Sequence, residues 1–300
     1  PLSSSAASDV YKRQGIYFAL GAYGIWGFAP IYFVWVSFAQ PLEVLAHRVV
    51  WGVPFLGLLL LATGQWRDIA EHSRRAIGYL LVSALFLSIN WLTFIYAIQT
   101  DRIAEASLGY FINPLVNILL GWLFLRERLG RLQWLAVSLA AIGVGSELIA
   151  RASLPWLGLT LAFSFGLYGL LRKQVNVPAV VGLSIETIML TPLAVGFLVW
   201  LGVNDGVREF DDILSLGLGG LVTVVPLVCF AAAAIRLPLS TLGFIQYLAP
   251  TCTLLLALFV YGENVPQERW LTFALIWAAL LLFSFEGVYR YRKERGEGSE

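Results

Sequence analysis

Apolar residues run through this chain in ten long stretches, and each stretch is followed by a short polar break. Each stretch is about 18–24 residues long, near the roughly 20 that a helix needs to cross the hydrocarbon core of a bilayer. The pattern predicts ten transmembrane helices at residues 15–36, 43–62, 77–99, 103–124, 132–150, 154–171, 179–202, 213–235, 239–261 and 268–289. The breaks are too short to fold as soluble domains, so we expect an all-α integral membrane protein.

The second half of the chain repeats the first. Residues 107–150 and 240–283 align at a constant offset of 136, which pairs Pro114 with Pro250 and Glu127 with Glu263. The repeats are predicted at 15–150 and 151–289, between a non-native or disordered tail (1–14) and a basic cytoplasmic tail (290–300). Because each repeat has five spans, the second enters the membrane inverted, as in many transporters that alternate between two mirror-related conformations.

Basic residues set the predicted orientation. One face of the predicted topology carries 15 Lys and Arg residues, including those of both termini, whereas the other face carries 4. Since cytoplasmic loops are enriched in Lys and Arg, both termini are predicted to be cytoplasmic.

Composition narrows the class further. The chain is 59% hydrophobic and 13% charged, whereas soluble domains carry about 25% charged residues. A net charge of +1 gives no basic field for nucleic acid, and two histidines offer no metal cluster. We therefore expect no nucleic-acid partner and no cofactor; the expected partners are the lipid bilayer and a small-molecule substrate. Cys229 and Cys252 lie in apolar stretches and are expected to be free thiols.

The two repeat-related prolines are predicted to kink their helices. Pro114 and Pro250 cannot donate to the carbonyls of Tyr110 and Gln246, and carbonyls freed at membrane depth persist only where they face protein or a wet cavity. Polar side chains accompany both kinks and predict a central binding cavity: Tyr110, Asn113, Asn117, Gln246, Tyr247 and Thr253. The alternative is that these amides simply bond neighbouring helices.

Two charges fall inside predicted spans at repeat-related positions. Arg48 and Glu186 are separated by the offset of 138 that also relates Pro54 to Pro192. A charge at the bilayer centre costs roughly 2.5–3.5 kcal/mol on insertion scales, so we expect both side chains to face the interior and lie near each other. One could bind a charged group of a substrate, and Glu186 is the best candidate proton carrier. The alternative is a structural ion pair or side chains that reach the interface.

Aromatic and amide side chains add further candidates for a binding surface. Asn90 and Trp91 lie in the third span, and Trp26 lies in the first. Placed beside a pocket, they would suit an amphipathic or aromatic solute; otherwise they pack in the core or face lipid.

Several blocks of the sequence resemble a known family. They are EASLGYFINPL at 105–115, YGIWGFAP at 23–30, HR at 47–48, NW at 90–91 and GFIQYLAP at 243–250. Together they resemble the RarD proteins of the EamA group, in the drug/metabolite transporter superfamily. The resemblance implies ten helices in two inverted repeats in a bacterial inner membrane, and a permease for small metabolites.

These patterns favour a secondary transporter, a permease or exporter that moves a small metabolite, amino acid or drug by alternating access. No phosphate-binding G-x-x-x-x-G-K-[ST] motif is present, and Ser184 lacks the second glycine of a G-x-S-x-G elbow, so we do not expect an enzyme. A lipid or lipid-carrier flippase stays open as the alternative. No oligomeric partner is required, since the predicted fold carries its own cavity.

Overall fold

The described part of the chain is built from helices. The computed structural model describes residues 4–100, 103–150, 156–175, 177–260 and 267–296. A short 3-10 helix spans Arg67–Ala70. The α-helices are α1 (Ser4–Trp35), α2 (Pro41–Thr63), α3 (Arg74–Gln99), α4 (Ile103–Phe124), α5 (Arg131–Ala150), α6 (Trp156–Val175), α7 (Ala179–Asp205), α8 (Phe210–Arg236), α9 (Leu239–Gln246), α10 (Leu248–Phe259) and α11 (Gln267–Gly296).

Hydropathy and length together identify helices that can cross a membrane. Within the described residues, 6 helical segments meet both conditions: Val10–Trp35, Pro41–Thr63, Arg74–Phe94, Ala179–Asp205, Phe210–Arg236 and Leu239–Leu256. Gly109–Phe124 and Trp270–Glu286 are shorter apolar segments. Every predicted span overlaps a helix of the structure, but the full count of ten spans and the inverted repeat stay predictions.

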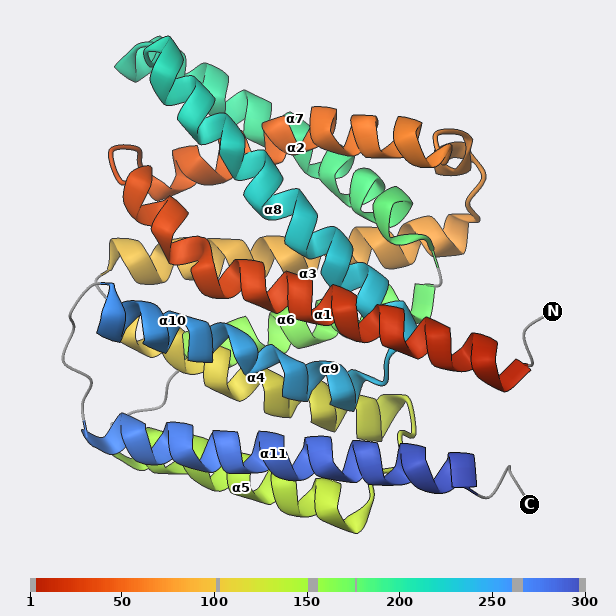
Figure 1. The fold of residues 1–300 in the computed structure, drawn as a ribbon. Helices are drawn as coiled ribbons and strands as arrows, with labels where there is room; N and C mark the ends of the chain where they lie inside the picture. The colour runs from red at the N-terminus through yellow and green to blue at the C-terminus, as the bar shows by residue number, and fades with distance from the viewer. Residues whose placement is uncertain (1–3, 101–102, 151–155, 176, 261–266, 297–300) are drawn as a thin grey trace.

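Helix ends differ from the predicted boundaries at both termini. α1 already begins at Ser4, so the first helix includes residues 4–14. That residues 1–14 are non-native or disordered stays a prediction. α11 likewise continues through the basic segment to Gly296. The beginning of α1 and the end of α11 lie at the same end of the molecule, as Figure 1 shows. Which side of the membrane this end faces stays a prediction.

Helices from the two halves of the sequence interleave. α1 packs along α8 and α10, α2 along α7 and α8, α4 along α6 and α9, and α5 along α11 (Figure 1). The α2–α8 crossing is close because Gly220 has no side chain there: a Cβ atom would come within 2.7 Å of the Trp51 carbonyl carbon. This packing holds α2, α3, α7 and α8 around a common interior.

The proline-containing helices of the two predicted repeats differ. Pro114 lies inside α4, which continues to Phe124, whereas the corresponding helix of the second repeat is interrupted at Tyr247 and separates into α9 and α10. At the interruption the Tyr247 N–H donates to the Phe244 carbonyl, at 3.2 Å, in place of the usual i−4 bond. Glu263, the repeat partner of Glu127, lies outside the described residues.

Candidate functional site

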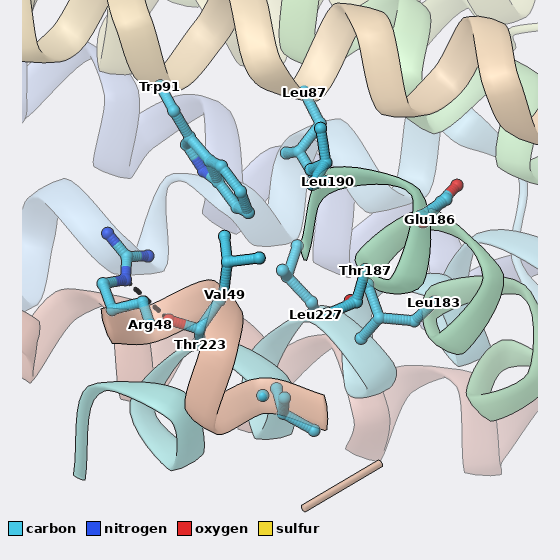
Figure 2. A pocket seen from close by; sticks show the side chains of 12 residues that line it. Arg48, Val49, Leu87, Trp91, Leu183, Glu186, Thr187, Leu190, Thr223 and Leu227 are labelled. Carbon is cyan, nitrogen blue, oxygen red and sulfur yellow. Dashed lines mark hydrogen bonds between the residues drawn. The ribbon is translucent and has the colours of Figure 1, made fainter. Parts of the chain in front are cut away.

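A narrow cavity lies between α2, α3, α7 and α8, so both halves of the chain contribute to it (Figure 2). Its interior has room for about one water molecule, which is too little for a metabolite. Three sequence-predicted site residues, Arg48, Trp91 and Glu186, line this cavity. The residues that line it are Arg48, Val49, Gly52, Leu87, Trp91, Leu183, Glu186, Thr187, Leu190, Thr223, Val224 and Leu227.

Arg48 occupies one end of the cavity. Its Nε donates a hydrogen bond of 2.6 Å to the Thr223 hydroxyl, which in turn donates to the Gly219 carbonyl at 2.6 Å. The guanidinium lies 5.4 Å from the ring centroid of Phe33 and 5.6 Å from that of Trp91, within the range of cation–π attraction. Gly219 leaves space for this arrangement, because a Cβ atom there would come within 2.8 Å of Arg48 Cγ.

Glu186 occupies the other end and is fully buried. Its carboxylate accepts hydrogen bonds from the hydroxyls of Ser83 and, at 3.5 Å, Tyr168. Arg172 Nη1 lies 3.7 Å from Glu186 Oε1, while Arg172 Nη2 donates to the Ala179 carbonyl at 3.3 Å. The ion-pair partner of Glu186 is therefore Arg172.

These contacts correct two predictions. Arg48 and Glu186 face the same interior but do not pair; Figure 2 shows them at opposite ends of the cavity, with Val49, Leu190 and Leu227 between them. The predicted span 154–171 ends just before Arg172 and so places it in a loop, yet in the structure its side chain is 0% exposed. α6 extends past the predicted span to Val175, and the Arg172 side chain turns back into a space left by Gly182.

The polar residues beside Pro114 and Pro250 mainly bond to one another and to the backbone. Asn117 donates to Gln246 at 2.7 Å, and the Tyr247 hydroxyl donates to the Phe111 carbonyl at 3.3 Å. Asn113 is buried, and its Oδ1 has no hydrogen-bond partner within the described residues. In this conformation the amides join α4 to α9, which favours the alternative of bonds between neighbouring helices over a polar cavity.

The remaining sequence-predicted residues are not among those that line the cavity. Asn90 donates to the Leu161 carbonyl at 2.9 Å and to the Ser164 hydroxyl at 3.1 Å, which joins α3 to α6. The Trp26 ring packs against those of Phe165 and Phe230, at 5.6 and 6.0 Å between centroids. Tyr110 is 48% exposed, and its ring lies 6.5 Å from that of Phe94.

Two polar contacts at the helix ends were not predicted. The Glu127 carboxylate accepts hydrogen bonds from the N–H groups of Leu239 and Ser240, at 2.5 and 2.9 Å, and so caps the first turn of α9. At the opposite end of the molecule, Glu43 binds Arg208 through two bonds of 2.9 Å. These bonds raise the pKa of Arg208, which lies in the α7–α8 loop. The predicted repeat draws attention to Glu127, because it aligns with Glu263. No pattern in the sequence links Glu43 with Arg208.

The cavity places the charged side chains of Arg48 and Glu186 inside the protein. Its charged groups lie on membrane-length helices from both halves of the chain, and among the described residues no group of three His, Cys, Asp or Glu side chains could hold a metal ion. Intramembrane charges that face a protein interior are typical of the pathways of transport proteins. Fold and site together define a helical membrane protein with a charged internal cavity.

Comparisons with known proteins identify the family. The model of the EamA-like transporter family matches residues 13–146 and again 153–285, so the chain belongs to this family. An uncharacterized transporter of Vibrio cholerae is 47% identical, over 92% of this chain and 93% of its own length. Protein RarD of Salmonella typhimurium is 46% identical, over 94% of this chain and 98% of its own length.

A solved structure supports the fold alone. The crystal structure of another protein aligns with this chain at a TM-score of 0.69 and 18% identity, covering 90% of this chain and 97% of the other. The family, the relatives and the apolar helices together establish a multi-pass transporter of the bacterial inner membrane.

Proposed function

We propose that this protein is a secondary transporter that moves a small metabolite, amino acid or drug across the inner membrane by alternating access. The observation that carries the proposal is the cavity, because α2 and α3 from the first half and α7 and α8 from the second enclose charged groups at membrane depth. Ten spans, two inverted five-helix repeats and cytoplasmic termini complete the proposal. The two separate matches to the family model support a repeat boundary between residues 146 and 153.

The described conformation is closed around the cavity. A cavity with room for about one water cannot admit a solute, so helices around it must move apart during transport. At one end of the molecule, Glu127 in the α4–α5 loop joins the two halves by accepting hydrogen bonds from the first turn of α9. Beside it, within the second half, Lys173 of α6 donates to the carbonyls of Ala234 and Leu237. We assign this end to the cytoplasmic side, following the excess of basic residues there.

Flux measurements test the proposal directly. Purified protein in lipid vesicles is compared with empty vesicles for a panel of amino acids, organic acids and aromatic drugs, with and without a pH gradient. We expect protein-dependent flux of at least one compound. No flux for any compound would contradict the proposal and favour the lipid flippase, which a fluorescent-lipid scrambling or flipping assay on the same vesicles would then detect.

The energy source is tested with one variant. Glu186→Gln removes the carboxylate that could carry a proton but keeps the size of the side chain. If flux depends on the pH gradient through Glu186, the variant loses this dependence while still exchanging labelled for unlabelled solute. Unchanged pH dependence in the variant would instead leave Glu186 as a structural partner of Arg172.

A further inference from the structure

The charges around the cavity do not balance. Glu186 and Arg172 form an ion pair, with 3.7 Å between their nearest charged atoms, so together they contribute no net charge. Arg48 forms no ion pair with any residue that the structure describes, and its side chain contacts the Thr223 hydroxyl and the rings of Phe33 and Trp91. The cavity therefore carries one uncompensated positive charge at membrane depth, where an unpaired charge is costly to retain.

The hydrogen-bonding groups of Arg48 are only partly used. Nε donates to Thr223, but neither terminal Nη nitrogen has a hydrogen-bond partner among the described residues. Figure 2 shows both terminal nitrogens turned away from the Thr223 hydroxyl. The contact to Thr223 fixes the plane of the guanidinium, and the two free nitrogens present the parallel donors that bind a carboxylate through two hydrogen bonds.

The surroundings of Arg48 restrict what could accompany such a carboxylate. The rings of Phe33 and Trp91 flank the guanidinium, and the middle of the cavity is formed by aliphatic side chains: Val49, Leu87, Leu183, Leu190 and Leu227. Once the helices separate, these surfaces would contact an apolar or aromatic body. Among the described residues, Glu186 is the only carboxylate that lines the cavity. It already pairs with Arg172, so none of these residues offers an unpaired acid there to an ammonium group.

We propose that Arg48 is the anchor for the carboxylate of the transported solute, and that the substrate class is organic carboxylates with an apolar or aromatic body. This inference rests on the proposed transport function. It excludes cationic amphiphiles as good substrates, because such a molecule would bring a second positive charge beside Arg48 with no free acid to balance it.

Binding to matched ligands tests this assignment. Three bodies (phenylethyl, indolylmethyl and hexyl) are each tested as the carboxylic acid, the primary amide and the primary amine, by thermal stabilisation of the purified protein in detergent. We expect at least one acid to bind on the order of 10- to 100-fold more tightly than its amide, as for hydrogen bonds to charged groups. Tight binding of an amide or amine, or no binding of any acid, would overturn the assignment.

Variants connect the acid preference to Arg48. Arg48→Gln should bind acid and amide equally, and Arg48→Lys should keep a reduced acid preference because the charge remains without the paired donors. Arg236→Gln is the matched control: Arg236 also lies over two rings, at 5.0 and 5.1 Å, and bonds a backbone carbonyl, but it does not line the cavity. Acid preference that survives in folded Arg48→Gln would refute the anchor.

Different flux results would reject this inference and the transport proposal. If vesicles with the protein carry amides, amines or neutral drugs but no acids, the protein is a transporter and Arg48 is not a carboxylate anchor. If no compound crosses at all, the transport proposal itself fails.

Discussion

At one end of the cavity the Arg48 guanidinium meets a threonine and two aromatic rings, whereas at the other the Glu186 carboxylate meets an arginine, a serine and a tyrosine. The two residues lie 138 residues apart, at corresponding positions of the predicted repeat. Corresponding positions therefore carry opposite charges, and only one of these charges is neutralised by the protein.

The difference separates a structural role from a binding role. A charge that the fold pairs internally contributes little attraction to a solute, because its field is already cancelled by its partner. A charge held by a neutral hydrogen bond and aromatic rings keeps its field and its donors. The Glu186 end should therefore govern stability, and the Arg48 end should govern ligand selection.

The largest expected effect is the difference in stability between the Glu186→Ala and Arg48→Met variants. Removing Glu186 leaves the fully buried Arg172 without a counter-charge, which should lower the free energy of unfolding by about 3–5 kcal/mol. Arg48→Met leaves no acidic side chain without a partner, because Arg48 forms no ion pair with a described residue. We therefore expect the free energy of unfolding to change by no more than about 1 kcal/mol. Thermal unfolding of each purified variant in detergent measures the difference.

A double variant provides the control for this prediction. Arg172→Met combined with Glu186→Leu removes both charges together, and should recover most of the stability that either single substitution loses. Equal destabilisation by Arg48→Met and Glu186→Ala would show that the two ends do not divide stability and ligand selection as described.

The sequence predicts the helices well because each apolar stretch is long enough to cross a membrane and is bounded by polar residues. It also predicts that Arg48 and Glu186 face the protein interior, since intramembrane charges avoid lipid. It does not identify Arg172, because a hydropathy pattern assigns an arginine at the end of an apolar stretch to a loop. Only the tertiary packing shows that a missing side chain, at Gly182 on a different helix, opens space for this guanidinium.

The prolines show a second limit of the sequence. Pro114 and Pro250 occupy corresponding positions and remove the same kind of donor, yet α4 continues past the first while the second repeat is interrupted at Tyr247. A missing hydrogen bond permits a break, but the packing around it decides whether the backbone departs from a helix. The Asn117–Gln246 bond likewise depends on the approach of α4 to α9, which no local pattern encodes.

An intermediate effect is expected at Gly182, which makes room for Arg172. A Cβ atom at this position would overlap the Arg172 guanidinium, so Gly182→Ala should displace Arg172 from Glu186 and cost about 2 kcal/mol of stability. Gly196→Ala in the same helix is the matched control, because a Cβ atom there meets nothing within 4 Å. Alanine is the better helix former, so the control should be neutral or stabilising by up to about 1 kcal/mol.

The same thermal unfolding assay compares the two glycines. If Gly182→Ala and Gly196→Ala unfold at the same temperature, Arg172 has an alternative position of equal energy, and the ion pair at the Glu186 end is not the fixed structural element described above.

The smallest expected effect concerns the hydrogen bond between Thr223 and Arg48. Thr223→Val keeps the shape of the side chain but removes the hydroxyl that accepts from Arg48 Nε, so the guanidinium loses the contact that fixes its plane. We expect binding of the preferred acid to weaken about fivefold, equivalent to about 1 kcal/mol, while binding of its amide is unchanged. Thr187→Val, in the same cavity but without a hydrogen bond to Arg48, should leave both affinities unchanged. Weakening that is equal for acid and amide, or equal in the two variants, would mean that Thr223 shapes the cavity without orienting Arg48.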